Sequence, residues 1–206
     1  MSNDTSENWL KFLNPESLKA NLIRSSIYIT CWEMLKNSVV DHPRTFYTST
    51  WEDGKFIPDP EYKKEVLALD DDPLIASALW FKNNGAIDTD DIILLRGFRS
   101  HRHEIAHELP KFLGDIQSNV QQEYFYGMLG LVAKIDKWWI KNFEIPINPD
   151  FDARNLSEED LDGVQSMSMI MMNLLISVAD GKDEQLRRLY TEMKKNIEAK
   201  KSSKSG

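Results

Sequence analysis

The sequence predicts an all-α protein built as a single bundle. Apolar residues recur every three or four positions through most of its 206 residues, the spacing that places them on one face of a helix. Hydrophobic residues make up 41% of the chain and aromatic residues 10%, which is enough to bury a core. One stretch, residues 45–57, instead has the β-branched and aromatic composition of strands. We therefore expect one domain spanning residues 1–206, with a small β-hairpin insertion near residues 45–57.

Proline, glycine and acidic caps divide the first half of the chain into helices. A long helix should begin at residues 14–17 (Asn-Pro-Glu-Ser) and end at residues 41–43 (Asp-His-Pro). The hairpin follows, with its turn at Asp53-Gly54. Two shorter helices are expected from about residue 60 to 69 and from 73 to 84, and Gly85 should end the second of them.

The second half is expected to contain three long helices and a basic end. Acidic residues at 88–91 should cap a helix over residues 89–109, because Pro110 cannot continue it. A further helix is expected over residues 117–143. The helix predicted over residues 158–179 is apolar almost all round, so we expect it at the centre of the fold. The C-terminal helices should extend to about residue 200, and residues 201–206 should be a disordered tail.

Charge and cysteine content exclude several classes of protein. The chain has 25 Lys and Arg against 33 Asp and Glu, a net charge of −8, so it is not a general polyanion-binding protein. A single cysteine, Cys31, excludes an internal disulfide framework and a Cys-rich zinc module, and is typical of the reducing cytosol. The polar N-terminus does not resemble a signal peptide, and the longest apolar run, Met167 to Ala179, is too short to span a bilayer. We expect a cytoplasmic protein that does not associate with membranes.

The residues that carry chemistry concentrate in the helix expected over residues 89–109. Three of the four histidines lie there, together with Arg96, Arg99 and Arg102. On a helical wheel Arg96, Arg99, His103 and His107 share one stripe beside the apolar edge of the helix. A concentration of arginine and histidine in an acidic chain indicates that a specific anion binds there, most simply a phosphate.

Arg102 occupies a position within the apolar stripe itself. That stripe is formed by Leu95, Phe98, Ile105 and Leu109. A guanidinium group among packing residues is costly unless it is paired, so Arg102 is a candidate functional residue. The structural alternative is that Arg102 extends past its neighbours to an acid at the edge of the core, such as Asp136 or Glu33.

The segment Arg102-His103-Glu104-Ile105-Ala106-His107 resembles the Arg-(four to six residues)-His motif of the HEPN superfamily (higher eukaryotes and prokaryotes nucleotide-binding domain). In that family the residue after the arginine is polar, and His103 fits. The family places the motif on a late helix of a four- to five-helix bundle. The resemblance covers residues 15–140, which would form the bundle core, with the helices of residues 158–200 as additions.

The resemblance implies metal-independent cleavage of RNA, with no cofactor. His107 would be the general base on the ribose 2′-hydroxyl, and Arg102 would hold the scissile phosphate. His103 would orient the backbone or assist the leaving oxygen. Arg96, Arg99 and His101 are expected to be supporting substrate contacts.

The resemblance also implies partners besides RNA. Arg102 and His107 diverge by about 140° around the helix, which matches the family habit of pairing two motif helices across a homodimer interface. Many members are toxins or abortive-infection factors that act against phage, some of them controlled by an antitoxin protein. One branch has a tyrosine two residues after the histidine as a target for nucleotidylation. Leu109 occupies that position here, so this mode of control is not expected.

Two other interpretations of the same segment stay open. His103-Glu104-Ile105-Ala106-His107 is also an HExxH string, in which the two histidines would share a zinc ion and Glu104 would activate water. Two features argue against a zinc peptidase. A charged residue, Glu108, follows the second histidine, and Pro110 occupies the position of the glycine in the extended zinc-binding motif. Glu123 or Glu144 would have to be the third zinc ligand. The other interpretation is a non-catalytic HEPN-like module that binds nucleotide, RNA or a partner protein through the same residues.

Overall fold

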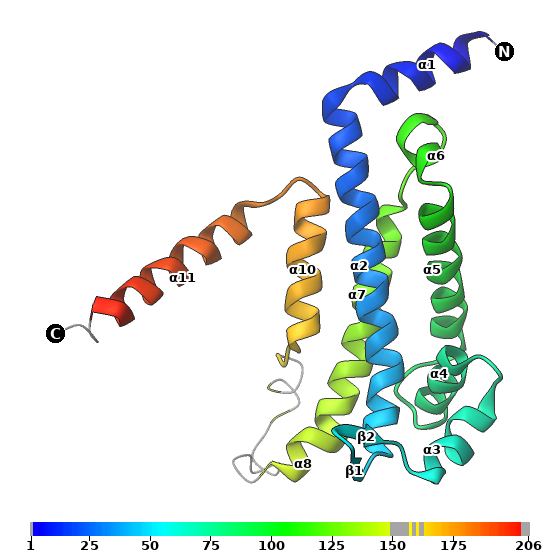
Figure 1. Cartoon of the computed structure of the whole chain (residues 1–206), viewed down its shortest axis with the longest axis vertical. Helices are drawn as coiled ribbons and strands as arrows, with labels where there is room; N and C mark the ends of the chain where they lie inside the picture. The colour runs from blue at the N-terminus through cyan, green and yellow to red at the C-terminus, as the bar shows by residue number, and fades with distance from the viewer. Residues whose placement is uncertain (1, 149–156, 158–159, 161–162, 203–206) are drawn as a thin grey trace.

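The computed structural model describes residues 2–148, 157, 160 and 163–202, and these residues form an all-α fold, as predicted (Figure 1). The helices are α1 (Ser2–Leu13), α2 (Pro15–Phe46), α3 (Pro60–Glu65), the 3₁₀ turn η1 (Leu67–Leu69), α4 (Pro73–Asn83), α5 (Thr89–His107), α6 (Leu109–Gly114), α7 (Gln122–Trp139), the π-helical turn η2 (Ile140–Glu144), α8 (Ile145–Ile147), α10 (Met167–Ala179) and α11 (Glu184–Ser202). Strands β1 (Thr50–Glu52) and β2 (Lys55–Ile57) form the hairpin.

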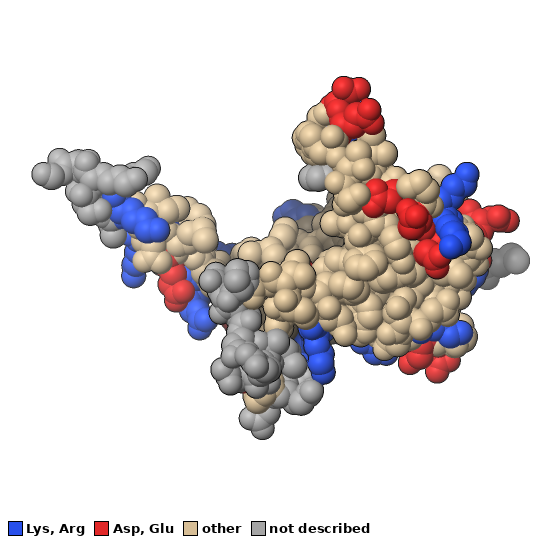
Figure 2. Space-filling model, turned by 90° about the horizontal axis from the view of Figure 1, so that it is seen from below, with Lys and Arg blue, Asp and Glu red and all other residues tan. Residues whose placement is uncertain are grey.

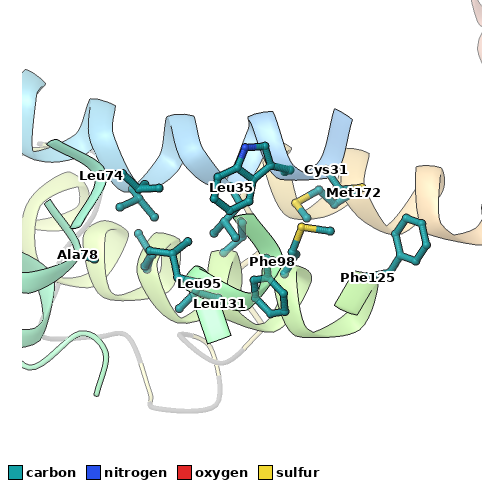
Figure 3. Close-up of a cluster of buried hydrophobic side chains, with 14 of the residues drawn as sticks. Cys31, Leu35, Leu74, Ala78, Leu95, Phe98, Phe125, Leu131 and Met172 are labelled. Atoms are coloured by element: carbon teal, nitrogen blue, oxygen red, sulfur yellow. The ribbon is translucent and has the colours of Figure 1, made fainter. Parts of the chain in front are cut away.

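The long helix α2 is the centre of the bundle. Asn14 caps its first turn by accepting hydrogen bonds from the N–H groups of Glu16 and Ser17. The helix packs against α7, α10, α4 and α5, and in Figure 1 α10 and α5 lie on opposite sides of it. Its inward side chains, among them Cys31 and Leu35, are fully buried with residues from the surrounding helices (Figure 3). These contacts fix α5, which carries the motif, against the core.

The prediction that α2 ends at residues 41–43 is wrong, because the helix runs through Pro43 to Phe46. Proline in a helix interior removes one hydrogen bond and costs about 3 kcal/mol. Tertiary contacts offset this cost. Pro43 is buried, and Phe46 contacts the rings of Trp80 and Phe143 from other helices. His42, predicted to lie in a loop without a role, therefore lies on the helix and points at α7.

The hairpin insertion is confirmed at residues 50–57. Its strands pair in antiparallel register with Trp51 opposite Phe56. Asp53 and Gly54, the two turn residues, have φ angles of +50° and +78°. Positive φ at both central positions is the type I′ turn that matches the twist of two-residue hairpins.

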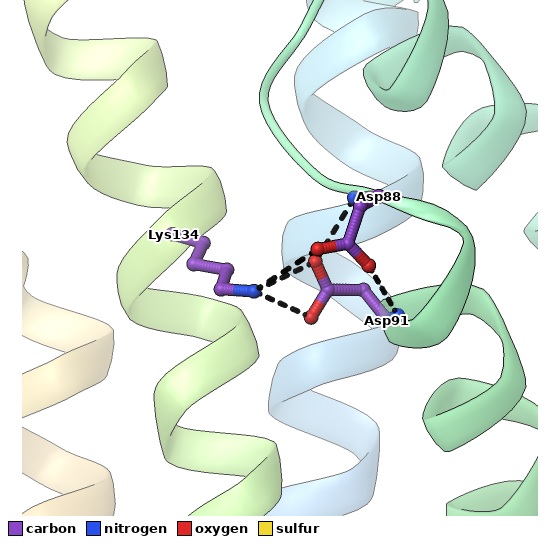
Figure 4. A network of polar contacts seen from close by, with 3 residues as sticks. All are labelled: Asp88, Asp91 and Lys134. Atoms are coloured by element: carbon purple, nitrogen blue, oxygen red, sulfur yellow. Dashed lines mark hydrogen bonds and ion pairs between the residues drawn. The ribbon is translucent and has the colours of Figure 1, made fainter.

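The start of α5 is held in place by a capping box and a lysine from α7 (Figure 4). The Asp88 carboxylate accepts a hydrogen bond from the Asp91 N–H, and the Asp91 carboxylate accepts one from the Asp88 N–H, each at 3.0 Å. Lys134 donates to both oxygens of Asp91, at 2.8 and 2.9 Å. This pairing satisfies the buried Asp91 carboxylate and raises the pKa of Lys134.

Farther along, α5 and α7 approach each other closely at a glycine. A Cβ atom added to Gly127 would lie 2.7 Å from the ring of Phe98. Only glycine leaves room for that ring, which is fully buried on the inner face of α5. The outer face of α5, which carries Arg96, Arg99, His103 and His107, is consequently turned away from α7.

Two other helix starts differ from the prediction. Helix α7 begins at Gln122 and not at residue 117, because Lys11 donates to the carbonyls of Asp115 and Ser118 and holds that segment as a loop. Lys11 belongs to α1, a helix that the sequence analysis did not predict. Helix α10 begins at Met167 after Ser166 as N-cap. Residues 158, 159, 161 and 162 of its predicted start lie outside the described residues.

The prediction that the last apolar helix is central is also wrong. Helix α10 lies at the edge of the bundle against α2 and α7 (Figure 1). Its inner face is buried, whereas Met167 and Met171 on the other face are 69% and 49% exposed. The apolar composition of α10 therefore does not mean that the whole helix is buried.

No helix among the described residues combines the length and hydrophobicity needed to cross a membrane.

Candidate functional site

Helix α5 directs its predicted site residues to three different environments. Arg96, Arg99, His103 and His107 are exposed, Arg102 is half-buried and His101 is buried. This difference follows from the 100° rotation between successive residues, since the inner face of the helix is fixed by Leu95, Phe98 and Ile105. The predicted site residues therefore do not all belong to one surface.

The exposed and half-buried arginines meet at a cavity of about 780 Å³, which we call the cationic pocket. It lies between α2, the start of α4 and α5. The lining residues are Trp32, Glu33, Lys36, Val40, Asp72, Pro73, Leu74, Arg96, Arg99, Ser100, Arg102 and His103. Four of these side chains are Lys or Arg and two are acidic, so the pocket is net positive in a chain whose net charge is −8. An anion is the ligand that such a pocket favours.

Arg102 lies on the wall of this pocket and pairs with Glu33 of α2. Its Nη2 atom donates to Glu33 Oε1 at 3.1 Å, which confirms the pairing expected for the structural alternative, with Glu33 and not Asp136 as the partner. Lys36 donates to the other oxygen of Glu33 at 2.5 Å. The hydrogen bond from Lys36, together with that from Arg102, lowers the pKa of Glu33. Arg102 Nε is buried and has no hydrogen-bond partner among the described residues.

The other two arginines differ in how far they are neutralised. Arg99 donates to Asp72, the residue that caps α4 through the N–H of Leu74. Burial opposes ionisation of Asp72, but the hydrogen bonds from Arg99 and Leu74 outweigh it and lower its pKa. Arg96 has no ion-pair partner among the described side chains. It is the cation of the pocket that is most readily available to a ligand.

The two outer histidines lie side by side at the edge of the pocket. The rings of His103 and His107 have centroids 4.3 Å apart. His103 lines the cationic pocket, whereas His107 does not. His103 thus connects the arginines to His107, and Arg102 and His107 do not line the same cavity.

His101 belongs to the core and does not reach the pocket. Its Nε2 atom accepts a hydrogen bond from the N–H of Gln121 at 3.2 Å, and its ring packs edge-on against Tyr28 and Tyr124. Burial lowers the pKa of His101, although Glu104 acts in the opposite direction. The structure therefore places His101 in the interior, and it does not line the cationic pocket.

The HExxH interpretation has its first two ligands but not a third. His103 and His107 lie close enough to share an ion. The described residues, however, contain no group of three His, Cys, Asp or Glu side chains that could hold a metal ion. Neither Glu123 nor Glu144 completes such a group.

Burial raises the pKa of the Cys31 thiol to about 12, so Cys31 is a packing residue, as expected.

A second cavity, of about 530 Å³, was missed by the sequence analysis, and we call it the anionic pocket. Its lining residues are Met34, Asn37, Ser38, Asp41, His42, Asp136, Trp139, Ile140, Glu144, Gln165, Ser166, Met167 and Ser168. Three of them are acidic and none is Lys or Arg. No local motif marks this pocket, because its walls come from α2, α7, η2 and the start of α10.

Asp136 is the centre of the anionic pocket and is 4% exposed. One carboxylate oxygen accepts hydrogen bonds from Ser38 at 2.5 Å and from His42 Nε2 at 3.1 Å, and the other accepts one from Ser166 at 2.5 Å. The His42 ring stacks on Trp139 with centroids 4.5 Å apart. Burial alone would raise the pKa of Asp136, but these three donors outweigh it and lower the pKa.

Comparisons with known proteins found no match to the chain. No family model matches the chain, and neither the curated proteins nor the solved structures contain a match. The resemblance to the HEPN superfamily therefore stays a prediction that depends on the Arg102–His107 motif and its place on a helix of an all-α bundle.

Proposed function

We propose that this protein is a metal-independent endoribonuclease of the HEPN type. It would act in the cytoplasm as a toxin or antiphage defence factor, in some settings under an antitoxin protein. The observation that carries the proposal is the cationic pocket, in which Lys36, three arginines and His103 line one cavity of a size typical of ligand sites. A cluster of this kind fits the phosphate backbone of RNA.

Arg102 is the residue proposed to hold the scissile phosphate. Its guanidinium presents a fork of donors that matches two phosphate oxygens. In the structure only part of this donor set is engaged. Nη2 donates to Glu33, whereas the buried Nε has no hydrogen-bond partner among the described residues. A phosphate entering the pocket would take over donors from Glu33 and gain the charge of Lys36.

His107 is the proposed general base, with His103 beside it. An imidazole titrates near neutrality and can accept the proton of a ribose 2′-hydroxyl. The 2′-oxygen then attacks phosphorus, the bond from phosphorus to the 5′-oxygen breaks, and that oxygen takes up a proton supplied by His103 in its protonated form. The products are a 2′,3′-cyclic phosphate and a free 5′-hydroxyl. No metal ion takes part in this sequence of steps.

A homodimer through α5 is part of the proposal, because Arg102 and His107 of one chain do not line the same cavity. Exposed residues Ile93, Arg96, Ser100, His103 and His107 follow one another at spacings of three and four along α5. They form one continuous stripe on the helix surface. Pairing two such stripes across a two-fold axis would bring His107 of one protomer toward the cationic pocket of its partner.

The test is cleavage of single-stranded RNA in excess EDTA by the full-length protein and two variants. We expect cleavage to survive chelation, and Arg102→Ala and His107→Ala each to lower the rate by about 100-fold or more. Product ends analysed by mass spectrometry should carry cyclic phosphate. Activity that is lost on chelation and restored by zinc would instead favour the HExxH peptidase-type site.

Glu33→Gln is the matched control, since it breaks the same ion pair as Arg102→Ala. If Arg102 only holds Glu33 in place, both variants will behave alike. If Arg102 binds phosphate, Glu33→Gln will keep the cleavage activity or increase it. The non-catalytic binding module is the second candidate function, and it is favoured by the position of His107 outside the pocket. It predicts that RNA binding requires Arg102 and that neither the wild type nor any of these variants cleaves RNA.

A further inference from the structure

Helices α10 and α11 each have an uncovered apolar stripe on one face. On α10 the stripe consists of exposed Met167, Ile170 and Met171 and half-buried Leu174, and on α11 of Leu186, Leu189, Tyr190, Met193 and Ile197. The α11 side chains are between 37% and 68% exposed. Monomeric soluble proteins rarely leave contiguous apolar surface of this kind open.

The two stripes have the same spacing. Each has apolar residues at positions i, i+3, i+4 and i+7, and the α11 stripe continues to i+11. The shared part is one continuous seam about 11 Å long. Such seams interlock when two helices pack against each other. The α10 stripe and the α11 stripe therefore have the dimensions to cover one another.

The turn between α10 and α11 keeps them apart within one chain. Gly181 has a φ angle of +73° and donates its N–H to the Val178 carbonyl at 3.0 Å, while the N–H of Lys182 donates to the Ser177 carbonyl at 2.7 Å. This pattern ends α10 with a left-handed glycine. Helix α11 then leaves the bundle and extends away from α10 (Figure 1).

The charge on α11 indicates what covers it. Residues 184–202 contain six Lys and Arg against three Asp and Glu, while the whole chain has a net charge of −8. Figure 2 shows the basic residues along the projecting helix, which stands clear of the body of the molecule. Two α11 helices packed together would repel each other, whereas α10 contains no charged residue between Met167 and Ala179 and belongs to the acidic part of the chain.

We infer that α11 of one protomer packs on α10 of a second copy of this chain, and that the exchange is reciprocal. A two-fold axis would then cover all four stripes, as in a dimer formed by exchange of a terminal helix. This interface lies on the side of α2 opposite to α5 (Figure 1), so it neither requires nor replaces the dimer contact proposed for RNA cleavage.

Cross-linking between two variants that each carry one added, exposed cysteine tests the inference directly. A Met171→Cys protein is mixed with a Met193→Cys protein and treated with a short bismaleimide, and the products are identified by mass spectrometry; the native Cys31 is buried. We expect a cross-link between position 171 of one copy and position 193 of the other. Because both positions are remote from α5, this result does not depend on whether the nuclease proposal holds.

The contribution of the α11 stripe is measured with a charge variant and its control. Met193→Glu should weaken self-association at least about tenfold in sedimentation equilibrium, because a buried methionine is replaced by a carboxylate. Thr191→Glu adds the same charge on the opposite, exposed face of α11 and should leave association unchanged.

Two other results would overturn the inference. If the Met171→Cys/Met193→Cys double variant cross-links only within a monomer, or if no cross-link forms, α11 does not cover a partner's α10. If the wild type stays monomeric and sediments with phosphatidylserine vesicles, and Met193→Glu abolishes this binding, the basic apolar helix is a membrane-binding element instead.

Discussion

The cationic and anionic pockets use charged side chains in opposite ways. In the cationic pocket four cations face two acids, and the side chains of Arg99 and Glu33 are 53% and 36% exposed. In the anionic pocket one carboxylate, that of Asp136, is 4% exposed and accepts three hydrogen bonds from protein groups. The first group of charges can exchange partners at low cost, whereas the second cannot.

This difference distinguishes a binding surface from a structural junction. Exposed ion pairs contribute little to stability, because water already screens them. A buried carboxylate costs free energy unless all of its donors are present, so removing it damages the fold. Asp136 joins α2, α7 and the first turn of α10 through Ser38, His42 and Ser166. We therefore propose the cationic pocket as the binding site and assign mainly a structural role to the Asp136 cluster.

The largest expected effect is that of Asp136→Ala on stability. The substitution leaves three buried or half-buried donors without an acceptor, and should lower the free energy of unfolding by about 3 kcal/mol. Denaturation by urea at pH 7 measures it. Asp41→Ala is the control in the same pocket, since Asp41 is exposed and pairs with exposed Arg44 at 3.7 Å; it should cost less than about 1 kcal/mol. Equal losses in the two variants would remove the distinction.

An intermediate effect is expected for RNA affinity in the Arg96→Ala/Arg99→Ala double variant. Each arginine that contacts a phosphate releases counterions, so the variant should bind single-stranded RNA about tenfold more weakly. The slope of log K against log salt should fall by about 1.4, because each contact to a single strand contributes about 0.7. Filter binding at several salt concentrations measures both quantities.

The control for this variant is Lys63→Ala/Lys64→Ala, which removes two exposed cations from α3, outside both pockets. It should leave the salt slope unchanged. A loss of slope in both double variants would mean that RNA responds to total charge and not to the cationic pocket.

The smallest effect is expected from the pH dependence contributed by His101. Burial lowers its pKa in the folded protein, so the folded state binds fewer protons than the unfolded state below about pH 6.5. The contribution of His101 to stability is thus complete above that pH and is lost as the pH falls. Unfolding free energies measured between pH 7.5 and 5 should decline, and His101→Gln should flatten the decline. An equally steep decline in the variant would show that other groups cause it.

The all-α class, the hairpin and the capping of α5 could be predicted from the sequence, because each depends on local chemistry. Asp88 and Asp91 are three residues apart, and Asp53-Gly54 favours a two-residue turn. The end of α2 could not be predicted, because Pro43 is an unfavourable helix residue that only contacts from distant helices make acceptable. Helix α1 was missed for a similar reason, since Lys11 is held by a loop about 100 residues later in the chain.

The sequence by itself determined that arginine and histidine gather on one acid-capped helix of an acidic chain, because residue order fixes which side chains share a helical face. Only the tertiary structure decided which of them reach a cavity. The packing of Phe98 against Gly127 turns His101 inward and leaves Arg102 against Glu33 at the cationic pocket. Only the tertiary structure, too, brought His42 to Asp136, 94 residues away. Contacts between helices depend on how each helix is rotated and docked in the bundle, and no short segment of sequence encodes that.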